Sequence, residues 1–435
     1  MTTPARFRRH LPGLALLVMP AVLAACDSLL DVEAPGRVAS TVLDDPNNAA
    51  LLVGGARAGF GCAFQAYVDG AAELTDEEDD TQLAAGAWDW DRRGWVGAIG
   101  EAFAEASCDN TSSYGVYRPI QTARFSADDA VTRLARFTDA QVSGRVRLLA
   151  QANLLKGYTR IVLGEGFCSS AFDLGAELAP AAVLTQAEQV FTEAIAAAAQ
   201  AGDASVTNAA RLGRARARRD LARLPNASVN AAKYAEAEAD AQAIPAGFVY
   251  QVQYNANATF SRNNLAARNR NLLLHSVGPN YRNLNDPRVV VTNSGQIGVD
   301  AVNVVWVADK YAGPAAPIAL ARYEEARLII AESQLAAGNT AAAIGTLNAL
   351  RGRAGVGLPA YGGATDPASV TAFLLSERSK ELFLEGQRFW DINRFALPLT
   401  PPVGAAYPGK GGTYANLRCL PLPDIERINN PNLGN

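Results

Sequence analysis

The stretch "ERSKELFLEGQRFWDINRF" covers residues 377–395, close to the end of this 435-residue chain. Its acids Glu377, Glu381 and Glu385 stand four residues apart, a spacing that places them on one face of a helix. Opposite charges stand three residues apart at Arg378 and Glu381, Glu385 and Arg388, Arg388 and Asp391, and Asp391 and Arg394. The pattern predicts one helix whose charges pair with each other and whose seam, formed by Leu375, Leu382 and Phe389, packs on a core.

Glu381 and Glu385 raise a second interpretation, because two carboxylates at a suitable separation can act as acid and base in glycoside hydrolysis. Each has an arginine within one turn, which favours the ionised form, whereas a general acid needs a raised pKa. The chain also lacks a G-x-S-x-G motif and a Cys/His set for nucleophilic catalysis. We therefore favour a structural role for this helix and a protein that is not an enzyme.

The N-terminus has the pattern of a bacterial lipoprotein leader. A basic start precedes the apolar stretch 11–24, which is shorter than the roughly 20 residues that a helix needs to span a bilayer. Small residues then precede Cys26 in "LAAC". We predict a signal peptide over residues 1–25 and lipidation of Cys26. The acyl chains would hold a tether of residues 26–45 at a membrane, because two or more chains anchor a protein stably.

Composition argues against several classes of function. Acids outnumber Lys and Arg by 43 to 39, and the resulting negative charge disfavours a nucleic-acid partner, because phosphate binding needs a basic surface. The chain has only His10 and His275; His10 leaves with the leader, and His275 has no evident partner. We therefore expect no metal centre and no cofactor.

Besides Cys26, four cysteines follow the leader, namely Cys62, Cys108, Cys168 and Cys419. An even number in an exported protein predicts disulfides, and four cysteines allow three pairings. Cys108 and Cys168 both stand in loop-like stretches. The spacings are not those of a zinc site.

Pairs of alanine-rich, amphipathic helices are predicted along the chain. The helices are 145–164, 184–200, 208–225, 230–244, 319–339 and 340–355. Thr185 and Glu188 form a capping box that would open the second of them. Small Ala or Gly residues stand where helices must touch, as in stacked tetratricopeptide-like pairs. We predict a helical N-terminal region over 46–250 and a C-terminal region over 251–435 that contains the pair at 319–355.

The C-terminal region also contains stretches of a different kind. Residues 247–317 are rich in Asn, Val and Tyr, with short β-prone runs between turns, and residues 397–414 form a Gly/Pro-rich loop. The protein should therefore combine a helical platform with an irregular, loop-rich part.

An aromatic cluster is the best candidate for ligand contact. "WDWDRRGW" places Trp88, Trp90 and Trp95 within eight residues, and an extended backbone would put the first two rings on one side. Flat rings flanked by polar groups suit sugars, whose C–H faces stack while their hydroxyls form hydrogen bonds. Further candidates for this surface are Tyr114, Tyr281 and Trp306. The alternative is that these rings pack the edge of the platform.

Two charge runs have a functional and a structural interpretation. The acidic run at residues 76–80 could bind Ca²⁺ through its carboxylates, but it lacks the glycine and spacing of an EF-hand. A solvated helix end or loop is therefore favoured. The run "RLGRARARRD" at 211–220 could contact an anionic surface. A solvated repeat-helix face with internal ion pairs is favoured there.

The chain resembles the SusD/RagB family of outer-membrane nutrient-uptake lipoproteins. The stretch at 377–395 resembles that family's C-terminal helix motif through Glu377, Arg378, Glu381, Leu382, Glu385, Gly386, Arg388, Asp391 and Arg394. Weaker similarities are "NDPRV" at 285–289, the stretch Asn348, Arg351, Arg353, Ala354 and Gly355, and the ending with Pro423, Glu426, Asn430, Pro431 and Asn435. The lipobox at Cys26 fits as well.

The resemblance implies a mostly α SusD-like fold, with tetratricopeptide-like helix pairs and an irregular, loop-rich C-terminal part. It also implies a lipoprotein anchored in the outer membrane and facing outward. Such a protein closes like a lid over a SusC-like TonB-dependent transporter and captures an oligosaccharide or peptide. Asp27 leaves the choice between inner and outer membrane open. The alternatives are an envelope scaffold lipoprotein that binds no nutrient and, less favoured, a glycosidase.

Overall fold

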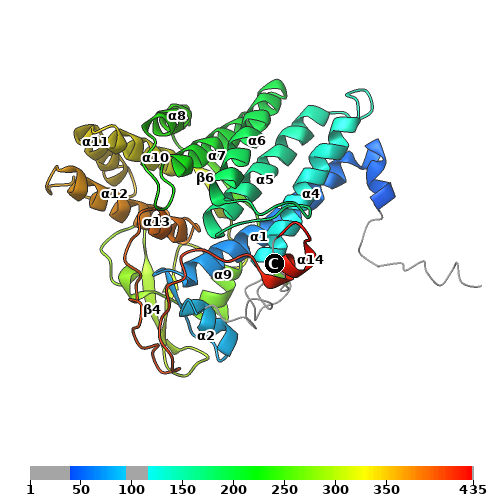
Figure 1. Ribbon diagram of the computed structural model, residues 1–435. Coiled ribbons are helices and arrows are strands. Elements are labelled where there is room, and N and C mark those ends of the chain that lie inside the picture. The colour runs from blue at the N-terminus through cyan, green and yellow to red at the C-terminus, as the bar shows by residue number, and fades with distance from the viewer. Residues whose placement is uncertain (1–39, 95–115, 434–435) are drawn as a thin grey trace, which may run out of the picture.

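The computed structural model describes residues 40–94 and 116–433. Most of these residues are helical, and the helices line up side by side over a loop-rich part with short strands (Figure 1). The helices are η1 (Ser40–Asp44), η2 (Pro46–Asn48), α1 (Ala49–Glu73), α2 (Ala85–Asp91), α4 (Tyr117–Arg136), α5 (Arg145–Gly166), α6 (Pro180–Gln200), α7 (Ala204–Ala222), α8 (Ala231–Gln242), η3 (Thr259–Ser261), α9 (Asn264–Ala266), η4 (Ala267–Asn271), η5 (Pro279–Tyr281), α10 (Tyr323–Ala336), α11 (Thr340–Arg351), α12 (Pro367–Glu381), α13 (Arg388–Arg394) and α14 (Asp424–Asn429).

Within the described residues, the strands form three two-stranded antiparallel sheets. They are β1 (Glu78–Asp80) with β3 (His275–Val277), β2 (Val249–Val252) with β6 (Ile318–Arg322), and β4 (Val291–Ile297) with β5 (Val304–Ala308). β-Branched and aromatic residues favour the strands β2, β4 and β5. Since two of the three sheets join segments far apart in the sequence, they tie the loop-rich part together.

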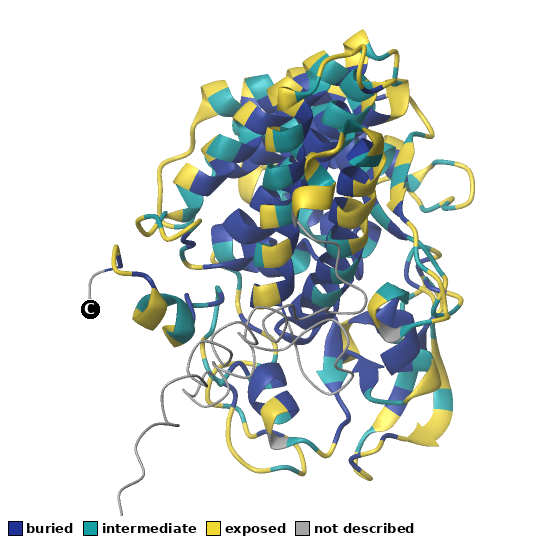
Figure 2. Ribbon diagram, turned by 90° about the vertical axis from the view of Figure 1, so that its right-hand side faces the viewer, coloured by how far each residue is buried: buried dark blue, intermediate teal, exposed yellow. Residues whose placement is uncertain are grey.

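The predicted helix pairs are present, and consecutive helices from α4 to α8 pack against each other, followed by α10 and α11. Small residues do stand at the helix contacts. The ring of Phe191 in α6 lies against both Gly157 in α5 and Gly213 in α7, where an added Cβ would come within 2.6 and 2.4 Å of it. Buried residues fill the interior of this array (Figure 2).

Three details of the helix predictions are wrong. α6 begins at Pro180, which suits the first helical turn, so Thr185 lies inside the helix and its hydroxyl donates to the Ala181 carbonyl. α10 begins only at Tyr323, because residues 318–322 pair with β2 as strand β6.

The third error concerns the arginine run of α7, which is only partly solvated. Arg216 and Arg219 are buried and face the neighbouring helices. Arg216 forms an ion pair with Glu165 at 2.5 Å, and Arg219 forms one with Asp220 at 2.6 Å. Their burial is possible because each guanidinium meets a carboxylate inside the protein.

The stretch 377–395 forms two helices instead of the one predicted. α12 ends at Glu381 and α13 begins at Arg388, with Leu384 and Gly386 in the left-handed region at φ 55° and 76° between them. The Leu384 N–H donates to the buried Glu77 carboxylate at 2.8 Å. This long-range bond satisfies a backbone group that a continuous helix would have bonded internally.

Most charges of this stretch pair with distant segments and not with each other. Asp391 does pair with Arg394 at 2.8 Å, as the spacing predicted. The other acids meet arginines and a lysine of distant segments: Glu377 with Arg288 and Arg351, Glu381 with Arg322 and Arg353, and Glu385 with Lys310 and Arg322. The separate sequence similarities at 285–289, 348–355 and 377–395 thus meet in one ion-pair network.

A disulfide joins Cys168, after α5, to Cys419 near the C-terminus, with the two Cα atoms 5.0 Å apart. Of the three pairings that four cysteines allow, only the one that joins Cys168 to Cys419 agrees with this bond. Cys62 lies in α1, and Cys108 is outside the described residues. Among the helices of residues 40–94 and 116–433, none combines the length and the apolar character that crossing a membrane requires.

Candidate functional site

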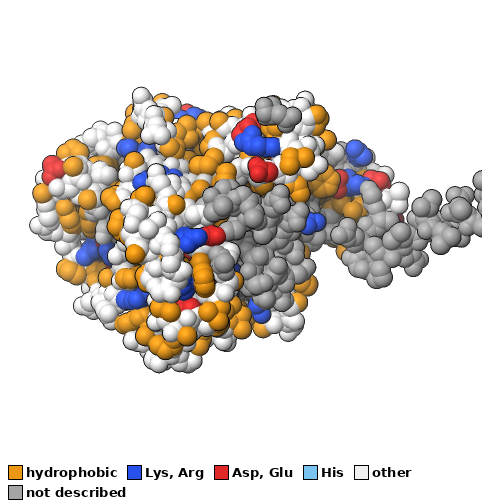
Figure 3. Space-filling model, turned by 60° about the horizontal axis from the view of Figure 1, so that its bottom comes forward, with side chains coloured by type: hydrophobic (Ala, Val, Ile, Leu, Met, Phe, Trp, Pro, Cys, Tyr) orange, Lys and Arg blue, Asp and Glu red, His pale blue; other side chains and the backbone are white. Residues whose placement is uncertain are grey.

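A cavity of about 390 Å³ lies where β1, η5, the β4–β5 hairpin and residues 400–414 meet. Its polar and aromatic wall consists of Asp76, Asp79, Asp80, Asp91, Asn280, Arg282, Asn303, Thr400, Tyr407 and Tyr414. Its apolar wall consists of Pro279, Val302, Val304, Pro401 and Pro408. Figure 3 views the end of the molecule that carries α2 and β4, where apolar side chains are interspersed with a few charged ones.

The acidic run supplies much of this wall, and it is buried where a solvated loop was expected. β1 pairs with β3, so that Glu78 lies opposite Val277 and Asp80 opposite His275. Each acid meets a partner from a distant segment: Asp76 meets Arg388, Glu77 the Leu384 N–H, Glu78 His275, Asp79 Arg282, and Asp80 Lys410. The expectation was wrong because these partners lie 197 to 330 residues away in the sequence.

Two aspartates of the cavity have strongly perturbed acidities. Burial raises the pKa of Asp79 to about 6, although Arg282 lies 3.0 Å from its Oδ2. Burial also raises the pKa of Asp91 well above its usual range, and the nearby charge of Asp79 adds to this effect. The Tyr407 hydroxyl donates to Asp91 at 2.8 Å. The cavity can therefore offer both protonated and ionised carboxyls to a ligand near neutral pH.

Two cations and two of the predicted tryptophans lie beside these acids. The Arg282 guanidinium lies 5.5 Å from the Trp306 ring centre, and Lys410 lies 5.8 Å from that of Trp88. Lys410 also pairs with Asp300 at 2.9 Å. Cation–π contacts of this kind fix long basic side chains in one direction. Trp88 and Trp306 are thus half-buried neighbours of the cavity.

The loop at residues 400–414 is held over the cavity by Arg93. Its guanidinium donates to the carbonyls of Thr400, Pro401 and Ala415 at 3.3, 2.5 and 3.1 Å. It also lies 4.9 Å from the Tyr414 ring centre. Arg93 and the wall residue Asp91 both belong to the motif "WDWDRRGW", so this motif helps to build the site through its charged residues.

Two other predicted ligand residues, Trp90 and Tyr281, do not lie on an exposed surface. "WDWDRRGW" begins in helix α2, so the extended backbone that would put the first two rings on one side is not formed. Trp90 is buried and donates to the Gly70 carbonyl at 2.9 Å, while Tyr281 is buried against Phe383. These two rings pack the core, as the alternative interpretation held. Trp95 and Tyr114 are outside the described residues.

Sequence reasoning missed Asp79, Asp91, Arg282, Tyr407 and Tyr414 as wall residues. The tyrosines stand in the Gly/Pro-rich loop 397–414, and their presence in such a loop was the one available signal. Asp79 could not be assigned, because a run of acids is more often solvated. Its position in the wall depends on the pairing of β1 with β3.

The carboxylates once considered for glycoside hydrolysis are engaged elsewhere. Burial raises the pKa of Glu381, but Arg322 and Arg353 overcome this effect and bring it below its usual range. The pKa of Glu385 is likewise lowered, since Arg322 and Lys310 outweigh burial. Both groups are held as carboxylates by ion pairs, which does not suit a general acid.

Comparisons with known proteins agree with this architecture. Residues 300–418 match the family model described as the SusD family. No curated protein matches the chain significantly.

Several solved structures share the fold at low sequence identity. A SusD superfamily protein from Parabacteroides distasonis is 14% identical with a TM-score of 0.65, covering 92% of this chain and 99% of its own. A SusD-like carbohydrate binding protein from Bacteroides vulgatus is 14% identical with a TM-score of 0.64, covering 89% and 97%. Surface glycan-binding protein A from Bacteroides fluxus is 14% identical with a TM-score of 0.58, covering 80% and 89%.

The predicted fold class is confirmed, since the structure is mostly helical with packed helix pairs and a loop-rich C-terminal part. Residues 300–418 match the SusD family model, and the chain has a SusD-like fold over 92% of its length.

Proposed function

We propose that this protein is a lipid-anchored capture subunit that binds an oligosaccharide and closes as a lid over a SusC-like TonB-dependent transporter. The observation that carries the proposal is the cavity at β1, η5 and the 400–414 loop, with its mixed carboxyl, amide, guanidinium and apolar wall. The wall can bond several hydroxyls while valine and proline side chains contact C–H groups. Two structures of the same fold are described as carbohydrate- and glycan-binding proteins, which supports this ligand class.

The ligand site is tested by blocking the cavity in the full chain and measuring binding on a glycan array. Val304→Trp places a large ring at the cavity wall, where Val304 is 38% exposed. Val299→Trp is the matched control, because Val299 is also exposed on the same hairpin but does not line the cavity. We expect the first variant to lose binding at least tenfold and the control to bind like wild type.

A larger cavity of about 590 Å³ between α1, α5 and β2 is the alternative ligand site. Its rim includes the exposed Phe260. If Phe260→Ala abolishes glycan binding while Val304→Trp leaves it intact, the ligand site is misassigned. If no glycan or peptide binds the wild-type chain, capture itself is refuted and the scaffold alternative is favoured.

The transporter partnership is tested by extracting the native protein in mild detergent. We expect a TonB-dependent β-barrel to co-purify, because a lid that closes over a transporter needs a large and partly polar interface. Isolation of the protein alone, from membranes that contain the transporter, would contradict the lid role. The anchor is tested separately, since Cys26→Ala should release the protein from the membrane fraction.

A further inference from the structure

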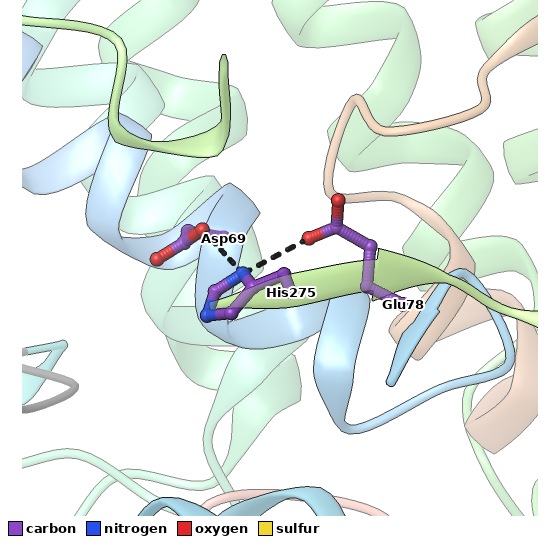
Figure 4. A group of neighbouring side chains, drawn as sticks. All are labelled: Asp69, Glu78 and His275. Carbon is purple, nitrogen blue, oxygen red and sulfur yellow. Dashed lines mark hydrogen bonds and ion pairs between the residues drawn. The ribbon is translucent and has the colours of Figure 1, made fainter. Parts of the chain in front are cut away.

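A second group of ionisable side chains lies next to the cavity strand β1 and is buried. It joins Asp69 and Glu73 at the end of α1, Glu78 in β1 and His275 in β3. All four are between 0 and 2% exposed. Figure 4 shows Asp69 and Glu78 approaching the same nitrogen of the His275 ring from two sides. His275, expected to have no evident partner, therefore lies among three carboxylates.

The two ring nitrogens of His275 have different surroundings. Nε2 lies 2.5 Å from Glu73 Oε1, a short charge-assisted hydrogen bond. Nδ1 lies 3.4 Å from Asp69 Oδ1 and 3.3 Å from Glu78 Oε2. A charged N–H between two carboxylates normally draws an oxygen to about 2.7–2.9 Å. The Asp69 and Glu78 oxygens, at 3.4 and 3.3 Å from Nδ1, both lie farther away than this.

These two longer distances have a simple geometric meaning. Ligand atoms of a tetrahedral ion with bonds of about 2.0–2.1 Å are separated by roughly 3.3–3.4 Å. Asp69 Oδ1, Glu78 Oε2 and His275 Nδ1 all lie within 4.8 Å of one another. Imidazole nitrogen and carboxylate oxygen are ligands that Zn²⁺ accepts. The three atoms can therefore share one ion at their centre.

The oxygen that Asp69 directs at this centre is otherwise unused. Within the described part of the chain, Asp69 Oδ1 accepts no hydrogen bond, and neither does Glu78 Oε1. The other Asp69 oxygen, Oδ2, pairs with Arg268 at 2.5 Å, which fixes the carboxylate so that Oδ1 faces His275. A buried carboxylate oxygen without a donor is costly, and a bound cation would satisfy it.

The charge balance of this region also favours a cation. Asp80 adjoins the group through β1, so four buried carboxylates gather around His275, together with Arg268 and Lys410. Lys410 is shared with Asp300, at 2.9 Å. Among residues 40–94 and 116–433, the acids around His275 therefore outnumber the permanent positive charges, and buried charges require compensation.

We propose that Asp69, Glu78 and His275 bind one divalent metal ion of the zinc class. Metal-bound histidines usually donate their second N–H to a carboxylate, which fixes the tautomer, and Glu73 stands at that position. The ion links α1, β1 and β3, and Glu78 immediately precedes the cavity residue Asp79. Its role is structural, because it fastens the strand that forms the floor of the cavity to the long helix α1.

The experiment uses the full chain produced with zinc in the growth medium and purified without chelators. Elemental analysis should find about one zinc per chain, and X-ray absorption should show only nitrogen and oxygen ligands. Removing the ion with a strong chelator should lower the melting temperature, and adding zinc back should restore it.

Variants keep the test independent of folding. Asp69→Asn and Glu78→Gln should each weaken zinc affinity more than tenfold, as measured by competition with a chelating dye. Asp286→Asn removes another buried carboxylate, paired with Arg288, and should leave the zinc content unchanged. Zinc below about a tenth of an equivalent in the wild-type chain, with no effect of chelator on melting, would overturn the proposal. Retention of zinc by both ligand variants would also overturn it. Neither result bears on glycan binding.

Discussion

Replacing Gly213 by alanine will destabilise the helix array, although alanine is the better helix former. The new Cβ would lie 2.4, 2.5 and 2.9 Å from three atoms of the Phe191 ring. The ring cannot shift towards α5, because it already packs closely against Gly157 there. A Cβ added at Gly157 would lie 2.6 Å from the same ring. Phe191 is also fully buried and in edge contact with Tyr158.

The magnitude follows from two opposing effects. Inserting a methyl group into a packed core costs about 1–3 kcal/mol. The gain in helix propensity from Gly to Ala returns roughly 1 kcal/mol. We expect a net loss of up to about 2 kcal/mol for Gly213→Ala. Gly345→Ala in α11 isolates the second effect, since no atom lies within 4 Å of its new Cβ, and should stabilise by about 0.5–1 kcal/mol.

The assay is urea unfolding followed by circular dichroism, with midpoints compared at equal slope. Adding Phe191→Leu to Gly213→Ala should recover stability relative to the sum of the single changes, because the smaller side chain vacates the overlapping volume. The reasoning fails if Gly213→Ala unfolds at the same urea concentration as Gly345→Ala, or above wild type.

Further predictions concern buried charge and the disulfide. Burial raises the pKa of Glu332, but Arg394 and Arg378 hold it at about 2 against an ordinary 4.5. About 3 kcal/mol of stability should therefore be present above pH 5 and vanish as the pH falls from about 4.5 to 2. An acid titration in which Glu332→Gln follows wild type throughout would contradict this prediction. Arg394→Met leaves Glu332 without its closest partner and should lower the unfolding free energy by about 3–5 kcal/mol, whereas a loss under 1 kcal/mol in urea would show that the pair is dispensable. Exchanging Cys168 and Cys419 for serine opens a loop closed over 251 residues and should cost about 2–5 kcal/mol, and an unchanged melting temperature would refute that contribution.

Local periodicity was sufficient to predict the helix pairs and the mixed character of the C-terminal part. Spacings of three and four residues depend only on the chain itself, so the helices over 145–164 and 230–244 are found close to where they were expected. Small residues at helix contacts, such as Gly157, are also a property of the local sequence. The spaced charges and glycine of residues 377–395 were distinctive enough to indicate the family.

Tertiary structure decided which partners most of the buried charges meet. Asp76 pairs with Arg388 across 312 residues, and His275 reaches Glu78 across 197, so no local window contains both partners. The same cause divides the predicted helix at residues 382–387, where a backbone N–H bonds Glu77. Periodicity determines which face of a segment is apolar. The position of a buried charge depends on compensation by groups that only the folded chain brings within 3 to 4 Å.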